Sequence, residues 1–137
     1  MPTSQIKDKA QVEKVFRRIL KGGPMRRLPK SKADRQVFLA LAASALDPRL
    51  EYSETGLNEC LADWMAVFTD PIVMDHVTIR RYLVDYSYVH RDAPGTTYRT
   101  NQTMINTVIA PEARSVLPLG LLEEIQLDQA ERRTLNT

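Results

Sequence analysis

Residues 75–86 read DHVTIRRYLVDY. On a helical wheel Ile79 and Leu83 lie on one apolar stripe together with two tyrosines, whereas Arg81 points to nearly the opposite side. Residues 87–100 follow, with two runs rich in β-branched and aromatic residues on either side of the turn sequence DAPG. A short helix with paired arginines before a hairpin is the outline of a winged helix-turn-helix. It predicts a helix that packs on a core with one face and meets a partner with the other.

Four amphipathic helices are expected between residues 3 and 86, each with a short polar residue at its N-cap. The expected caps are Thr3 or Ser4, then Ser31, Ser53 and Asp75, with Asp70 as an alternative for the last. Residues 22–24 (GGP) stop the first helix, and Asp47-Pro48 stops the second. In the third helix, Trp64 is expected to anchor the core and Cys60 to pack among apolar neighbours.

Beyond the hairpin, residues 104–110 are expected to be extended and residues 118–135 helical. Leu50–Tyr52 is a candidate third strand, because a two-stranded hairpin alone is marginally stable. We therefore predict a mostly helical α+β fold of winged helix-turn-helix type, with a three-helix core, a β-hairpin and N- and C-terminal extension helices. The predicted segments are 1–30, an N-terminal amphipathic helix and basic linker; 31–101, a winged-helix-like domain; and 102–137, a C-terminal extension and candidate dimerisation element.

Basic residues are concentrated in the first quarter of the chain. Residues 1–36 contain 11 Lys or Arg against 3 Asp or Glu, whereas residues 37–137 contain 8 against 14. This asymmetry is typical of a segment that meets an anionic partner. It is equally typical of a basic arm that neutralises the acidic remainder of its own chain, and the sequence leaves both interpretations open.

The predicted functional site is an interface with double-stranded DNA. The major groove admits one helix, and an arginine can reach two acceptors on guanine, while other cations contact phosphates. The predicted DNA-binding residues are Thr78, Arg80 and Arg81 of the helix, Arg91, Thr96 and Arg99 of the hairpin, and Arg26, Arg27, Lys30 and Lys32 of the linker. In the alternative, purely structural interpretation, Arg81 pairs with Asp85 on the next turn, and the first helix covers the outward-facing Val77 and Val84.

Enzyme chemistry is not expected from this sequence. It has no HxxxH, CxxC, nucleophile elbow or Gly-rich phosphate loop, and His76, His90 and Cys60 are too few for a typical metal site. We therefore expect no catalytic residues, no metal and no cofactor. The chain also lacks an apolar run of membrane-spanning length and the apolar core of a signal peptide, which indicates a cytoplasmic protein without a membrane partner.

Several stretches resemble an uncharacterised bacterial domain family that stands alone or follows the winged helix of arsenic-repressor-type transcriptional regulators. They are RLPKSK at 27–32, YSE at 52–54, LNECL at 57–61, DHVTIRRYLVDY at 75–86 and VHRDAPGTTYR at 89–99. The resemblance covers roughly residues 20–100, and the chain departs from it by PIVM at 71–74 and by the tail after Thr100. It implies a regulator-associated, helical domain with a small hairpin.

Together these features predict a small bacterial DNA-binding transcriptional regulator that forms a homodimer through its terminal helices. The alternative is a ligand-sensing or protein-interaction module of a regulator that does not itself bind DNA. That alternative predicts an apolar pocket near Trp64 and Tyr86.

Overall fold

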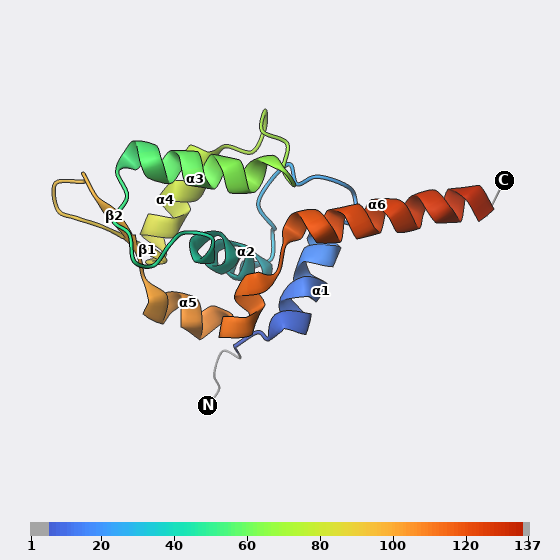
Figure 1. Cartoon of the computed structure of the whole chain (residues 1–137), viewed down its shortest axis with the longest axis horizontal. Helices are drawn as coiled ribbons and strands as arrows, with labels where there is room; N and C mark the ends of the chain where they lie inside the picture. Colours follow the sequence, from blue (N-terminus) through green and yellow to red (C-terminus); the bar gives the residue numbers. More distant parts are fainter. Residues whose placement is uncertain (1–5, 136–137) are drawn as a thin grey trace.

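The computed structural model describes residues 6–135, and Figure 1 shows a body of packed helices from which the last helix projects. The elements, in chain order, are α1 (Lys9–Ile19), α2 (Lys32–Ser44), α3 (Glu54–Ala66), α4 (His76–Asp85), β1 (Val89–Arg91), β2 (Tyr98–Thr100), α5 (Gln102–Val108), the 3-10 helix η1 (Pro111–Ser115) and α6 (Pro118–Leu135). The fold is therefore α+β and mostly helical, as predicted. Within residues 6–135, no helix has both the length and the apolar character that a membrane span requires.

Four aromatic side chains join α1, α2 and α3 in the centre of the core. Phe16 and Phe38 are fully buried, and Phe68 lies edge-on to both rings. Trp64 packs against Phe38 at a centroid distance of 5.6 Å and against Phe68 at 4.8 Å, although it is only partly buried itself. Trp64 thus anchors the core from its edge, and α1 completes the cluster through Phe16.

The helix N-caps follow the predicted chemistry except at α1. Ser31, Ser53 and Asp75 accept backbone N–H bonds at the starts of α2, α3 and α4. The cap of α1 is Asp8, whose carboxylate accepts from the Gln11 N–H at 2.8 Å while the Gln11 side chain accepts from the Asp8 N–H at 2.9 Å. This reciprocal capping box starts α1 later than expected, and the predicted caps Thr3 and Ser4 lie outside the described residues.

Of the predicted third strand, a single residue pairs with the hairpin. In the hairpin, His90 pairs with Arg99 across β1 and β2. Tyr52 then forms an antiparallel bridge with Tyr98, in which each N–H donates to the other carbonyl at 2.8 Å. Leu50 and Glu51 do not extend this pairing, so the third strand is one residue long.

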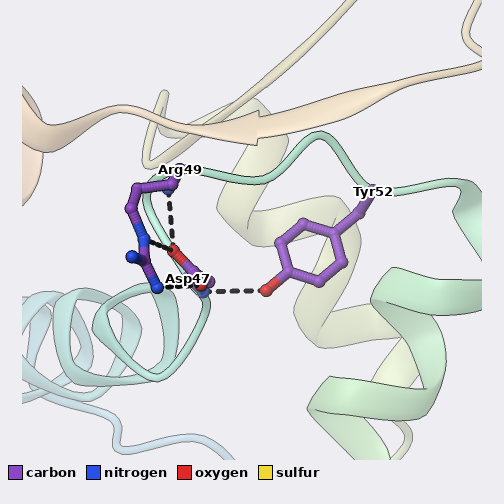
Figure 2. A network of polar contacts seen from close by, with 3 residues as sticks. All are labelled: Asp47, Arg49 and Tyr52. Carbon is purple, nitrogen blue, oxygen red and sulfur yellow. Dashed lines mark hydrogen bonds and ion pairs between the residues drawn. The ribbon is translucent and has the colours of Figure 1, made fainter.

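The loop that leads to Tyr52 is fixed by polar contacts (Figure 2). The Asp47 N–H donates to the Tyr52 hydroxyl at 2.8 Å, and the Asp47 carboxylate accepts from the Arg49 backbone and guanidinium. The hydrogen bond from the Arg49 side chain lowers the pKa of Asp47, and the same carboxylate raises the pKa of Arg49. The loop therefore holds Tyr52 where the hairpin can pair with it.

The chain enters the hairpin through a left-handed residue. Ser87, with φ +66°, follows the C-cap of α4. The Ser87 N–H donates to the Val84 carbonyl and the Tyr88 N–H to the Leu83 carbonyl, which together form a Schellman motif. The turn buries Tyr88, and burial raises the pKa of its phenol to about 12.

The predicted extended segment at residues 104–110 is wrong for most of its length. Residues 102–108 form α5, capped by Asn101 and packed on α2 through Ile105, Met104 and Val108. These apolar positions fit a helical period as well as an alternating one, and packing on α2 decides between them. Ile109 and Ala110 are extended, and Ile109 bridges Lys7 in parallel.

Candidate nucleic-acid interface

Helix α4 has a buried face and an open face. Ile79 and Leu83 are at most 1% exposed and seat the helix on the core. Thr78, Arg81 and Asp85, one turn apart, are exposed on the other side. The packing of α4 against α2, α3 and β1 therefore fixes the direction in which Thr78 and Arg81 point.

Arg80 does not share the open face with Arg81. Its guanidinium donates to Asn58 Oδ1 at 2.8 Å and lies 3.6 Å from Glu54 Oε1, and its side chain is only 14% exposed. Neighbouring helical residues point about 100° apart, so the two arginines turn to different surroundings. Contrary to the prediction that both arginines contact a partner, Arg80 joins α4 to α3.

Glu54 connects this contact to the hairpin. The Tyr98 hydroxyl donates to Glu54 Oε1 at 3.3 Å, which is the same oxygen that faces Arg80. Glu54 stands at the first position of α3, so one carboxylate links α3, α4 and β2. The sequence analysis missed this role of Asn58, Glu54 and Tyr98. The sequence carried only a weak signal for it, because adjacent helical residues point about 100° apart and can turn to different surroundings.

Arg81 is free of intramolecular partners among residues 6–135. Its guanidinium makes no hydrogen bond or ion pair there, and the alternative pair with Asp85 is not formed. Helix α1 packs on α2, η1 and α6 instead of covering α4, while Val77 and Val84 are half-buried. The outer face of α4 is thus open to a partner.

The hairpin adds two exposed guanidinium groups. Arg91 and Arg99 are exposed on neighbouring strands, and neither makes an ion pair within the described part of the chain. Thr96 is exposed too, but its N–H and hydroxyl both donate to Asp92, at 2.7 and 3.0 Å. The hydrogen bond from the Thr97 backbone N–H contributes most to lowering the pKa of Asp92, and the two bonds from Thr96 add to it. Together they bring this pKa to about 2. Thr96 is therefore engaged in shaping the turn.

The basic linker lies beside the loop that leads into α4. The Asp70 N–H donates to the Met25 carbonyl at 2.8 Å, and Met25 bridges Thr69. Arg26 stands 3.8 Å from the Asp70 carboxylate, whereas the exposed Arg27, Lys30 and Lys32 make no ion pair within residues 6–135. The structure thus brings part of the linker next to the loop before α4, and most of the predicted linker cations make no ion pair within residues 6–135.

Cys60 is exposed, contrary to the prediction that it packs inside. The buried residues of α3 are Leu57, Leu61 and Met65, and Cys60 falls one residue off this stripe. Among residues 6–135, no three His, Cys, Asp or Glu side chains gather in a way that could hold a metal ion.

The chain was also compared with known proteins. The family described as "Uncharacterized protein conserved in bacteria (DUF2087)" matches residues 24–100, more than half of the chain. The chain belongs to this family. No curated protein and no solved structure matches it. The matched region runs from the basic linker to β2, so it contains the open face of α4 and the hairpin.

Proposed function

We propose that this protein is a small DNA-binding regulator in which α4 enters the major groove of duplex DNA. The supporting observation is the exposed Arg81, which makes no ion pair within residues 6–135 and stands on a helix whose opposite face is buried. Thr78 is exposed beside it, and its hydroxyl donates to the Asp75 carboxylate at 3.5 Å. An arginine so placed can donate to two acceptors on guanine. Arg91 and Arg99 on the hairpin then contact the phosphate backbone.

The order of the elements supports this role. Helix α2, the bridging residue Tyr52, helices α3 and α4 and the β1–β2 hairpin follow one another as the elements of a winged helix do. The joint between α3 and α4, residues 67–75, is longer than the three or four residues of a simple helix-turn-helix. The resemblance to a domain family that stands alone or follows the winged helix of arsenic-repressor-type regulators implies association with a regulator, and we place the proposed role in the bacterial cytoplasm.

The proposal includes a homodimer, because helix-turn-helix proteins read paired half-sites as dimers. Helix α6 buries Leu121 and Leu122 near its start, whereas Leu127 and Leu135, further along the helix, are 63% and 84% exposed. A second copy of the chain would cover these leucines. Sedimentation at rising protein concentration checks this, and a monomer throughout would contradict it.

The ligand-sensing alternative draws less support. The hollow beside Tyr86, lined also by Lys32, Arg35 and Leu39, has a volume of about 20 Å³. Small-molecule sites usually have volumes of about 300–1,000 Å³. This hollow is too small to serve as the expected pocket.

The test is the affinity of Arg81→Ala for labelled random-sequence duplex, measured by fluorescence anisotropy. Loss of one base or phosphate contact should weaken binding roughly 5- to 100-fold, and wild-type binding should fall steeply with salt. Lys14→Ala, which removes one exposed charge from α1, is the control and should bind as the wild type does. Binding by Arg81→Ala that equals the wild type, or no salt-dependent binding by the wild type, would overturn the proposal.

A further inference from the structure

Three hollows that share lining residues lie between the loop before α4 and helix α6. The first, about 350 Å³, is lined by Arg26, Arg27 and Val73. The second, about 370 Å³, shares both arginines and continues to the turn at residues 22–24. The third, about 690 Å³, shares that turn and reaches Arg132 and Arg133 on α6. We call the three hollows together the basic track.

The basic track has more positive charge than its carboxylates neutralise. Arg18, Arg26 and Arg132 pair with Asp34, Asp70 and Asp128 at 2.6, 3.8 and 3.2 Å, respectively. The four remaining cations make no ion pair within residues 6–135, and they are Lys21, Arg27, Lys30 and Arg133. Only one carboxylate, that of Asp34, lines the three hollows, and Arg18 already occupies it. Such a concentration of one sign of charge attracts a polyanion.

Backbone contacts fix the track at both ends. At one end, Met25 is bonded to Phe68 and Asp70, so the linker is held beside the loop before α4. At the other end, the Gln129 side chain donates to the Lys21 carbonyl at 3.2 Å, which holds α6 beside the turn. The track is therefore built into the fold, although its cations are carried on long, exposed side chains.

The lining chemistry selects phosphates over bases. Guanidinium groups bind phosphate oxygens in a bidentate manner, and ammonium groups add point charges. Single-stranded nucleic acid is usually held by stacking on aromatic rings. The residues that line the three hollows include no Phe, Tyr, Trp or His. A duplex backbone, which shows phosphates outside and stacks its bases within, fits this lining.

We propose that the basic track binds the sugar-phosphate backbone of the same duplex whose groove receives α4. This inference rests on the proposed function, because it names the duplex that α4 contacts. The track begins near α4, since Val73 lies two residues before the Asp75 cap of that helix. It adds Lys21 and Arg133, on the turn and on α6, to the nucleic-acid contacts. The protein then contacts DNA through two surfaces. One is formed by α4 and the hairpin, and the other is the basic track.

The test compares two double variants on random duplex between about 50 and 200 mM salt. Lys21→Ala with Arg133→Ala removes two phosphate contacts, and should reduce the slope of log affinity against log salt by about 2. Lys9→Ala with Lys14→Ala removes the same charge from exposed sites outside the track, and should leave the slope unchanged. All four side chains are exposed, so thermal unfolding of both variants should match the wild type.

The outcomes separate this inference from the proposed function. An unchanged slope in the track variant, together with weaker binding by Arg81→Ala, would overturn the track and leave the α4 interface standing. A reduced slope in the track variant with full binding by Arg81→Ala would support the track and overturn the α4 interface. Displacement of the duplex by polyglutamate as readily as by unlabelled duplex of equal charge would overturn the assignment to a phosphate backbone.

Discussion

Two regions of the molecule carry unpaired cations: the first is the surface of α4 and the hairpin, and the second is the basic track. Their cations are supported in different ways. Arg81 stands on a helix held by Ile79 and Leu83, which are at most 1% exposed. Most of the unpaired track cations stand on a turn and a linker whose shape depends on backbone bonds and on Gly23, with φ +111°. A rigid support suits recognition of base edges, which needs fixed geometry. A chain of flexible side chains suits phosphates, which repeat along the backbone whatever the sequence.

The largest expected effect comes from removing the support of α4. Leu83→Ala leaves a cavity under the helix and should lower the free energy of unfolding by about 2–5 kcal/mol. In Gly23→Ala in the track, the added Cβ would have no atom within 4 Å. Only the strain of the positive φ should therefore lower the free energy of unfolding, by about 1–3 kcal/mol. Urea denaturation measures both, and an equal or larger loss in Gly23→Ala would contradict the difference in support.

A smaller effect should separate the two adjacent arginines. Arg80→Ala removes the hydrogen bond to Asn58 and the ion pair with Glu54, and should lower the free energy of unfolding by about 1–2 kcal/mol. Arg81→Ala removes an exposed side chain and should change the free energy of unfolding by less than about 0.5 kcal/mol. Thermal and urea denaturation of the two variants check this. Similar losses in both would mean that Arg81 is structural as well.

The smallest effect is a pH dependence in the hairpin turn. The pKa of Asp92 is lowered from 3.8 to about 2, because its carboxylate accepts from Thr97 and Thr96. Because the pKa of Asp92 is lower in the folded chain, its carboxylate is protonated at a higher pH in the unfolded chain than in the folded one. The stabilisation is therefore complete above pH 3.8 and is lost as the pH falls towards 2. Asp92→Asn should be less stable than the wild type at neutral pH, and this difference should shrink below pH 3.8. A constant difference down to pH 2 would contradict this origin.

Local signals predicted the helices and the hairpin well. Ser31, Ser53 and Asp75 are short polar residues before apolar periodicity, and all three cap the helices they were expected to cap. Helix α6 also has the predicted bounds. These features depend on neighbours a few residues apart, and the sequence displays those neighbours directly.

The features that sequence analysis did not predict depend on distant partners. The sequence predicts an extended segment at residues 104–110 because it does not show that α2, against which α5 packs, lies beside them. Arg80 was grouped with Arg81 because Asn58, its partner, is 22 residues away. The alternative in which basic residues neutralise acidic ones holds for part of the basic segment. Arg17 and Arg26 pair with Glu124 and Asp70 of the acidic remainder, whereas Arg27 and Lys30 make no ion pair within residues 6–135.

The pairing of Lys7 joins parts of the chain that are far apart in sequence. Its N–H donates to the Val108 carbonyl at 2.9 Å, and its carbonyl accepts from the Ala110 N–H at 2.8 Å. During synthesis, the segment before α1 must wait until residues 108–110 leave the ribosome. Such non-local closure slows folding, because the entropy of a long loop is lost before its contacts form. Lys7 is thus among the last residues of these elements to find its partners, while α2, α3 and α4 can assemble before it.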